Sequence, residues 1–173
     1  MSLDSLQALF TEEIKDIYNA EKQLLVALPR MAKAAESPEL QQAFTNHLKE
    51  TEGQVQRLET VLRDLGEAVR GKQCKGMQGI IEEGKEILEK KSEAEGSVLD
   101  AALIASAQKV EHYEIASYGC LVTYAQLLGL TEAERLLKQT LAEEEAADKK
   151  LNQLAEGGIN DAAAAAGVET RDQ

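Results

Sequence analysis

Tryptophan is absent from the sequence, and phenylalanine and tyrosine together make up only 3% of its 173 residues. Alanine, leucine, glutamate and lysine dominate instead, which is a composition typical of an all-helical protein. A chain of this length is expected to form one domain, and its 43% hydrophobic content is sufficient for a real core.

Cysteine is also scarce, with two residues, Cys74 and Cys120. They lie far apart and lack the spacing of metal ligands, so we expect two ordinary reduced thiols. Long apolar runs are missing too. The N-terminal stretch MSLDSL has neither a basic segment nor an apolar run, and we therefore expect no signal peptide, no transmembrane span and no membrane partner.

Positive charge is in short supply, since 19 Lys and Arg residues face 31 Asp and Glu residues, for a net charge of -12. Binding to nucleic acid depends on basic residues that neutralise phosphates, so this balance argues against a nucleic-acid partner. It argues equally against an anionic membrane surface. The partner that such a charge favours is a cation.

Apolar residues recur at three- and four-residue steps along most of the chain, and this period predicts helices. Short turns join the first long helix to the second and the third to the fourth, whereas the connection between the two pairs is long. That order is the wiring of a ferritin-like antiparallel four-helix bundle. The expected long helices are 3–35, 38–66, 97–128 and 132–156, with a short extra helix at 77–91 on the crossover. We assign 1–158 to the bundle and 159–173 to a flexible or partly helical tail.

Local signals support these boundaries. Ser37 precedes Pro38 and reads as the N-cap of the second long helix. Gly129 is a C′ glycine at the end of the third, and Thr131 is expected to cap the fourth.

Two carboxylates interrupt the apolar stripe of the third long helix. Glu111 and Glu114 share a helical face with Ile104 and Tyr118, so both acids point toward a core. Buried like charges repel each other and are unfavourable unless they are protonated, paired or bound to a cation.

The other long helices add acids at a matching depth, and no Lys or Arg occupies the central stripe positions. Two divalent ions bridged by carboxylates would neutralise such a set. Hard oxygen ligands favour iron or manganese, with zinc as a third candidate, and we expect no organic cofactor. The predicted central cluster is Glu21, Glu50, Glu111, Glu114 and Glu144, bordered by His47, Gln54 and Asp148.

A blander interpretation is that some of these acids point outward and the others meet basic residues. His47 fits the role of a hydrogen-bonded core histidine as well as that of a ligand. The Glu-x-x-His motifs of di-iron bundles are missing, because His47 precedes Glu50 instead of following an acid. Tyr18 and Tyr118 flank the acids, and we expect their hydroxyls to bond carboxylates.

Five segments of the chain resemble the bacterial YciF-like stress-protein family, in register over about residues 5–156. They are IYNAEKQL (17–24), HLKETEGQ (47–54), CKGMQGIIEE (74–83), KVEHYEIASYG (109–119) and LAEEEAAD (141–148). The resemblance implies a ferritin-like bundle in a cytoplasmic, stress-associated protein that forms a homodimer. Likeness to rubrerythrins is more distant. Two cysteines cannot build a rubredoxin-type Cys₄ module, so a redox cycle would need an external reductant.

Three hypotheses follow for the function. The first is a di-metal oxidoreductase acting on peroxide or O₂, and the second is a non-catalytic metal-binding protein that uses the same acids. The third is a metal-free structural or interaction protein that works as a homodimer. The stacked acids favour the first two, whereas the missing Glu-x-x-His pairs favour the last two.

Overall fold

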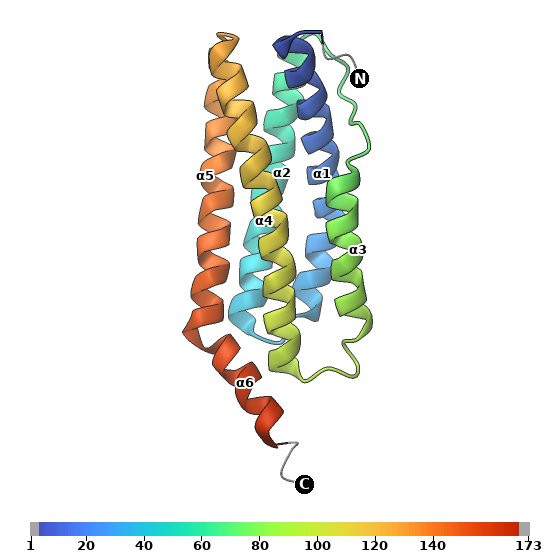
Figure 1. Cartoon of the computed structure of the whole chain (residues 1–173), viewed down its shortest axis with the longest axis vertical. Coiled ribbons are helices and arrows are strands. Elements are labelled where there is room, and N and C mark those ends of the chain that lie inside the picture. Colours follow the sequence, from blue (N-terminus) through green and yellow to red (C-terminus); the bar gives the residue numbers. More distant parts are fainter. Residues whose placement is uncertain (1–3, 170–173) are drawn as a thin grey trace.

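The computed structural model describes residues 4–169, and within this range it contains helices and no strand. Four long helices form an antiparallel bundle, with the short helix α3 along one side and α6 at the C-terminal end (Figure 1). This confirms the predicted ferritin-like bundle. The helices are α1 (Leu6–Ala34), α2 (Pro38–Asp64), α3 (Lys75–Glu89), α4 (Gly96–Leu127), α5 (Thr131–Leu154) and α6 (Asn160–Glu169). None of the helices in this range is both long enough and apolar enough to cross a membrane.

The connection from α2 to α4 runs the length of the bundle. Helix α2 ends near the start of α1, whereas α4 begins at the opposite end, and α3 bridges the two levels (Figure 1). Helix α3 packs on α1 and α4. Its residues Ile80, Ile81, Ile87 and Leu88 are partly buried against the core. The crossover with its extra helix is therefore present as predicted.

The helix ends agree with most of the local signals. The Ser37 hydroxyl accepts a hydrogen bond from the Leu40 N–H at 3.3 Å, and Pro38 follows as the first helical residue. Gly129 adopts φ +69°, a conformation that favours glycine. The prediction for Thr131 was wrong. The helix starts at Thr131 itself, and Leu130 occupies the N-cap position without a side-chain hydrogen bond.

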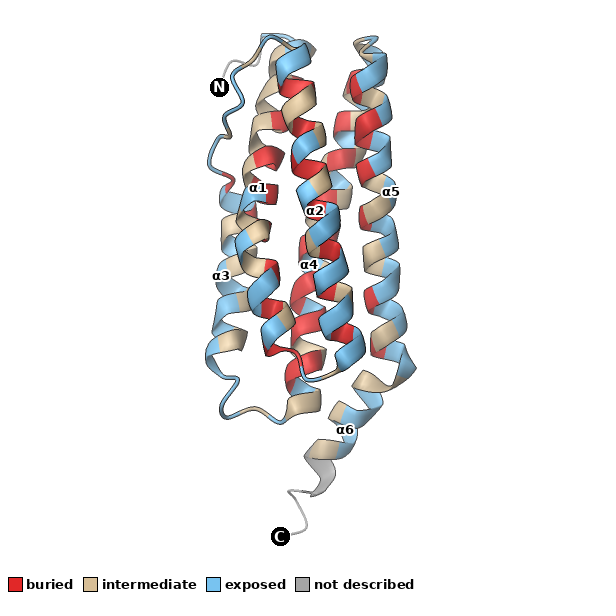
Figure 2. Cartoon of the chain, turned by 180° about the vertical axis from the view of Figure 1, so that it is seen from behind, coloured by how far each residue is buried: buried red, intermediate tan, exposed pale blue. Residues whose placement is uncertain are grey.

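The apolar stripes of the long helices face one another and form the core, as the buried residues in Figure 2 show. Full burial of a Leu or Ile side chain contributes about 1.5–3 kcal/mol, so these stripes supply most of the stability of the bundle. Phe10, Ile14, Leu40, Leu62 and Leu103 are completely buried.

Buried polar groups attach the crossover to the bundle. The Cys74 N–H donates to the Asn19 side chain at 2.8 Å, and the Cys74 sulfur lies 3.0 Å from the Tyr113 hydroxyl. That hydroxyl donates to Asp16 at 3.1 Å. Burial raises the pKa of the Cys74 thiol, which keeps it protonated and inert. Cys74 and Cys120 are both free, and Cys120 is exposed.

The chain continues past α5 through a kinked turn at Ala155–Ile159, where Gly158 has φ +136°. Helix α6 follows and packs on α4. Residues 160–169 of the predicted tail are therefore helical, and its last four residues lie outside the described range.

Candidate metal centre

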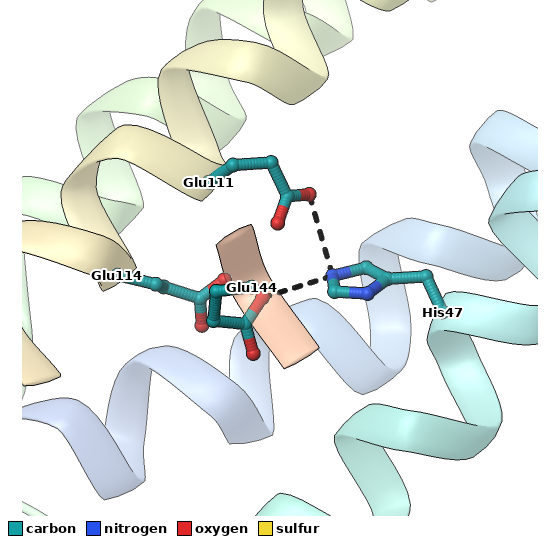
Figure 3. Close-up of side chains that lie close together, drawn as sticks. All are labelled: His47, Glu111, Glu114 and Glu144. Carbon is teal, nitrogen blue, oxygen red and sulfur yellow. Dashed lines mark ion pairs between the residues drawn. The ribbon is translucent and has the colours of Figure 1, made fainter. Parts of the chain in front are cut away.

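Three helices bring one histidine and three glutamates together in the middle of the bundle. His47 comes from α2, Glu111 and Glu114 from α4, and Glu144 from α5. One ligand atom from each residue lies within 4.8 Å of the others, and the side chains point toward a common centre (Figure 3). On α4, the three-residue spacing places both glutamates on the same helical face.

His47 is the member of the cluster that α2 contributes. Its Nε2 is 3.3 Å from Glu111 Oε1 and 3.7 Å from Glu144 Oε2, without a hydrogen bond to either (Figure 3). Its Nδ1 lies 3.4 Å from Glu50 Oε2. A carboxylate on one ring nitrogen orients the imidazole and leaves the other nitrogen available as a metal ligand.

Glu21 on α1 extends the acidic cluster on the side of Glu114. The Tyr118 hydroxyl donates to Glu21 Oε1, whereas Glu21 Oε2 has no partner. Both carboxylate oxygens of Glu114 are buried without hydrogen bonds. An orphaned buried oxygen is destabilising by about 1–3 kcal/mol, so these three oxygens are unfavourable to the fold.

Amide and guanidinium groups bond the carboxylates at the α2–α5 boundary. The Gln54 side-chain N–H donates to Glu144 Oε1. Arg57 is directed away from the cluster, because its guanidinium bonds Glu143 and the Thr140 hydroxyl. Within residues 4–169, no Lys or Arg is among the buried residues, so the carboxylates lack a buried cationic partner of that kind.

Burial without neutralisation disfavours the ionised carboxylates. Desolvation, reinforced by the charge of Glu144, raises the pKa of Glu21 to about 8. Desolvation also raises the pKa of Glu111 to about 8. The pKa values of Glu114 and Glu144 lie well above the ordinary range, again mainly through burial. These shifts favour protonated carboxyl groups in this core at neutral pH.

The pKa of His47 is raised as well. Burial alone would lower this pKa, but the hydrogen bond to Glu50 and the charges of Glu144 and Glu21 outweigh that effect. In their ionised form, Glu144 and Glu21 stabilise any positive charge at this point. A metal ion would meet the same favourable field as the imidazolium proton.

The donor set fits a metal ion. Imidazole nitrogen and carboxylate oxygen suit iron, manganese and zinc. Opposite ligands of one such ion are about 4.2 Å apart, so small carboxylate rotations would adapt the 4.8 Å grouping to it. The buried atoms left without hydrogen bonds in the described residues lie mostly in or beside this group. They are Glu21 Oε2, His47 Nε2, Gln54 Oε1, Glu111 Oε2, Glu114 Oε1 and Oε2, Glu144 Oε2 and Asp148 Oδ1.

The structure places some of the predicted site residues differently from the sequence-based expectation. Glu50 was expected in the centre, but its side chain is 47% exposed and reaches only the outer nitrogen of His47. His47 was expected at the border and lies within the cluster. Asp148 is at the border as expected, where it lies 3.3 Å from the exposed His112. Tyr18 does not serve the acids of the cluster, because its hydroxyl donates to Glu59.

Sequence reasoning missed the Arg57–Glu143 pair that closes the α2–α5 boundary beside Gln54. The signal for it was present, since Arg57 follows Gln54 by three residues and Glu143 adjoins Glu144. Only the packing of α2 on α5 shows that the two belong together.

The fold and the site define a class of protein, the ferritin-like four-helix bundles with a carboxylate-rich core and a histidine that could hold a metal. The chain belongs to the family described as "Domain of unknown function (DUF892)", which matches residues 5–164. It is 46% identical to Protein YciF of Escherichia coli K12 over 161 residues, which cover 92% of this chain and 96% of that protein.

Solved structures agree with this membership. The crystal structure of the E. coli stress protein YciF superposes with a TM-score of 0.86 and covers 91% of this chain and 99% of that one. YcfI from Rhodopseudomonas palustris, provisionally described as a structural protein, is 43% identical, with a TM-score of 0.80 and coverage of 88% and 97%. A protein from Xanthomonas campestris at 22% identity shares the fold, with a TM-score of 0.72 over 97% of this chain and 99% of that one.

Proposed function

We propose that this chain binds a pair of divalent iron or manganese ions in the bundle core and that the loaded protein reduces peroxide or O₂ under stress. The observation that carries the proposal is the set of buried carboxylate oxygens without hydrogen bonds around His47. Orphaned buried acids are rare, because each one destabilises the fold, and they cluster at functional sites.

In this proposal His47, Glu111, Glu114 and Glu144 hold the metal, with Glu21 beside them. Iron or manganese would supply the redox chemistry, whereas zinc would fit the donors but is not redox-active. The chain supplies the orientation. Tyr118 fixes the Glu21 carboxylate, Gln54 fixes Glu144, and Glu50 fixes the His47 ring.

The chain would also exclude competing chemistry. Leu103, Leu121 and Leu137 are buried in the apolar core of these helices and would restrict access of water. Reduction of one hydrogen peroxide to two waters consumes two electrons and two protons. The protein has two cysteines and no Cys₄ module, so the electrons would come from an external reductant.

A second candidate is a structural role without turnover, in which the protein acts as a homodimer. It is favoured by the missing Glu-x-x-His pairs and by the description of YcfI as a structural protein. Light scattering tests the dimer, since a particle of 18.8 kDa at micromolar concentration would contradict it.

Metal analysis tests the main proposal. Protein purified without chelator is expected to contain close to two ions of iron or manganese per chain. Its melting temperature should fall after chelation and recover with Fe²⁺ or Mn²⁺, because a ligand that binds only the native state stabilises it. Metal-free protein whose melting temperature does not respond to either ion would contradict the proposal. Metal binding without peroxide or O₂ consumption, with reductant present, would favour the structural role.

A further inference from the structure

A pocket of about 550 Å³ opens between α2 and α5 and reaches the cluster. His47 and Glu111 belong to its lining, and both are at least nine-tenths buried. Glu50 lines the same pocket, but its side chain is half exposed. A second pocket, of about 420 Å³ between α1 and α3, touches none of the four clustered residues.

The walls of the α2–α5 pocket carry small side chains. Ala43 stands on α2, and Ala146 and Ala147 stand on α5. Larger residues at these positions would fill the space in front of His47. The charged residues Glu39 and Lys150 also line the pocket, and both are exposed to solvent.

Glu50, His47 and Glu111 form a series from solvent to core. The Glu50 carboxylate lies 3.4 Å from the outer ring nitrogen of His47, and the inner nitrogen lies 3.3 Å from Glu111. A hydrated divalent cation must exchange its waters for protein ligands, and a carboxylate at a partly exposed position can replace the first of them. Negative charge along a cleft also raises the local concentration of cations.

We propose that the α2–α5 pocket is the route by which a divalent cation enters and leaves the cluster, and that Glu50 is a transit ligand in it. The inference rests on the proposed metal site. It assigns Glu50 a role in the rate of uptake in addition to its contact with His47, whereas the four buried residues hold the ion.

The test measures uptake and release of Co²⁺, followed by its visible absorption, in the full-length protein. Ala43→Leu/Ala147→Leu narrows the pocket from both walls. Ala142→Leu is the matched control, because Ala142 is an exposed alanine of α5 outside the pocket lining. The two single variants, Ala43→Leu and Ala147→Leu, replace the double variant if it does not fold by circular dichroism.

Narrowing an entry route slows uptake and release of the cation by the same factor, so the dissociation constant does not change. We therefore expect uptake and chelator-driven release in the narrowed variants to slow together by about tenfold or more, with an unchanged dissociation constant. Glu50→Gln should also slow uptake at an unchanged stoichiometry, because an amide is a poorer first ligand for a hydrated cation than a carboxylate. Ala142→Leu should behave as wild type.

Wild-type rates in every narrowed variant would overturn the route while leaving the metal site intact. Wild-type uptake by Glu50→Gln would overturn its role as a transit ligand. A wild-type protein that takes up no Co²⁺, Fe²⁺ or Mn²⁺ would overturn the route and the proposed function together.

Discussion

The carboxylate of Asp100 accepts a hydrogen bond from the backbone N–H of Ser37 at 2.7 Å, and a second from the Glu36 N–H at 2.8 Å. Asp100 is in the first turns of α4, and it is 3% exposed. It thereby connects the second helical hairpin to the turn of the first. The backbone donors would otherwise lie unpaired at the N-terminus of α2.

Asp100→Ala is expected to destabilise the fold by about 3 kcal/mol, because two hydrogen bonds to a charged acceptor contribute about 1.5–3 kcal/mol each and water can replace part of the loss. Urea unfolding of the metal-free protein measures this difference. Metal affinity should not change, since Glu111 lies eleven positions after Asp100 on the same helix, a rise of about 16 Å. Glu145→Ala, at an exposed site of α5, is the control and should stay within about 0.5 kcal/mol of wild type.

The variant Glu111→Gln tests whether Glu111 is a metal-binding acid or an acid in an ordinary salt bridge. Burial raises the pKa of Glu111, and the negative charge of Glu21 disfavours its ionised form further. At pH 8.5 without metal, we expect the variant to melt about 2–4 °C above wild type, because removal of one charge relieves repulsion worth about 1 kcal/mol. The stabilisation by added Fe²⁺ or Mn²⁺ should be lost. Scanning calorimetry with chelator and with metal gives both values.

The outcome that would contradict this prediction is a lower melting temperature in chelator, which is the behaviour of an acid whose buried basic partner has been left unpaired. Glu145→Gln serves as the control. It removes the same charge from the exposed face of α5 and should change neither the apoprotein nor the response to metal.

The stability of the metal-free protein should fall as pH rises. Glu21 and Glu111 have pKa values of about 8 in the folded state, against 4.5 for an ordinary glutamate. The folded state then binds more protons than the unfolded state between these values. The contribution of the two groups is complete below about pH 4.5 and is lost as pH rises through about 8, by up to about 1.4 kcal/mol per pH unit and group.

Thermal melts in chelator from pH 5.5 to 8.5 measure this slope. Metal should reduce or reverse it, because its ligands must be deprotonated and its affinity therefore increases with pH. A flat chelator profile would show that the carboxyls are ionised and paired already.

Two glycines of α3 offer a matched comparison. A Cβ added at Gly76 would lie 2.7 Å from the Tyr113 ring, whereas one added at Gly79 would meet nothing within 4 Å. Tyr113 has little freedom to move, since its hydroxyl contacts both Cys74 and Asp16. Gly79→Ala should stabilise the protein by about 0.5–1 kcal/mol, the usual gain inside a helix. Gly76→Ala should destabilise the protein and increase hydrogen exchange in α3. An equal gain in stability from both substitutions would contradict the role of Tyr113.

The sequence contained enough to predict the bundle, because helical periodicity and two short turns leave little choice of topology. It also placed Glu111 and Glu114 correctly in the core, since three-residue spacing keeps them on one face. It failed for Glu50, which lies at the edge of the α2 stripe. The rotation of α2 against α5 decides whether such a residue points in or out, and that rotation is set by packing.

The periodicity of the sequence also could not predict the hydrogen bonds of Asp100. Its partners Glu36 and Ser37 precede it by more than sixty residues. Only the meeting of the two hairpins brings them together. The Thr131 error has a smaller cause, because one residue of helix extension moves a hydroxyl from the cap into the first turn.

The four clustered residues come from both hairpins, with His47 on α2 and Glu111, Glu114 and Glu144 on the second pair. Neither hairpin alone therefore contains all four residues. An ion bound at the centre would join the two halves, and they could not separate without breaking a metal–ligand bond. The lifetime of the native state, which is set by its unfolding rate, would then depend on metal supply. A cell that withdraws the metal would shorten that lifetime without altering a single residue.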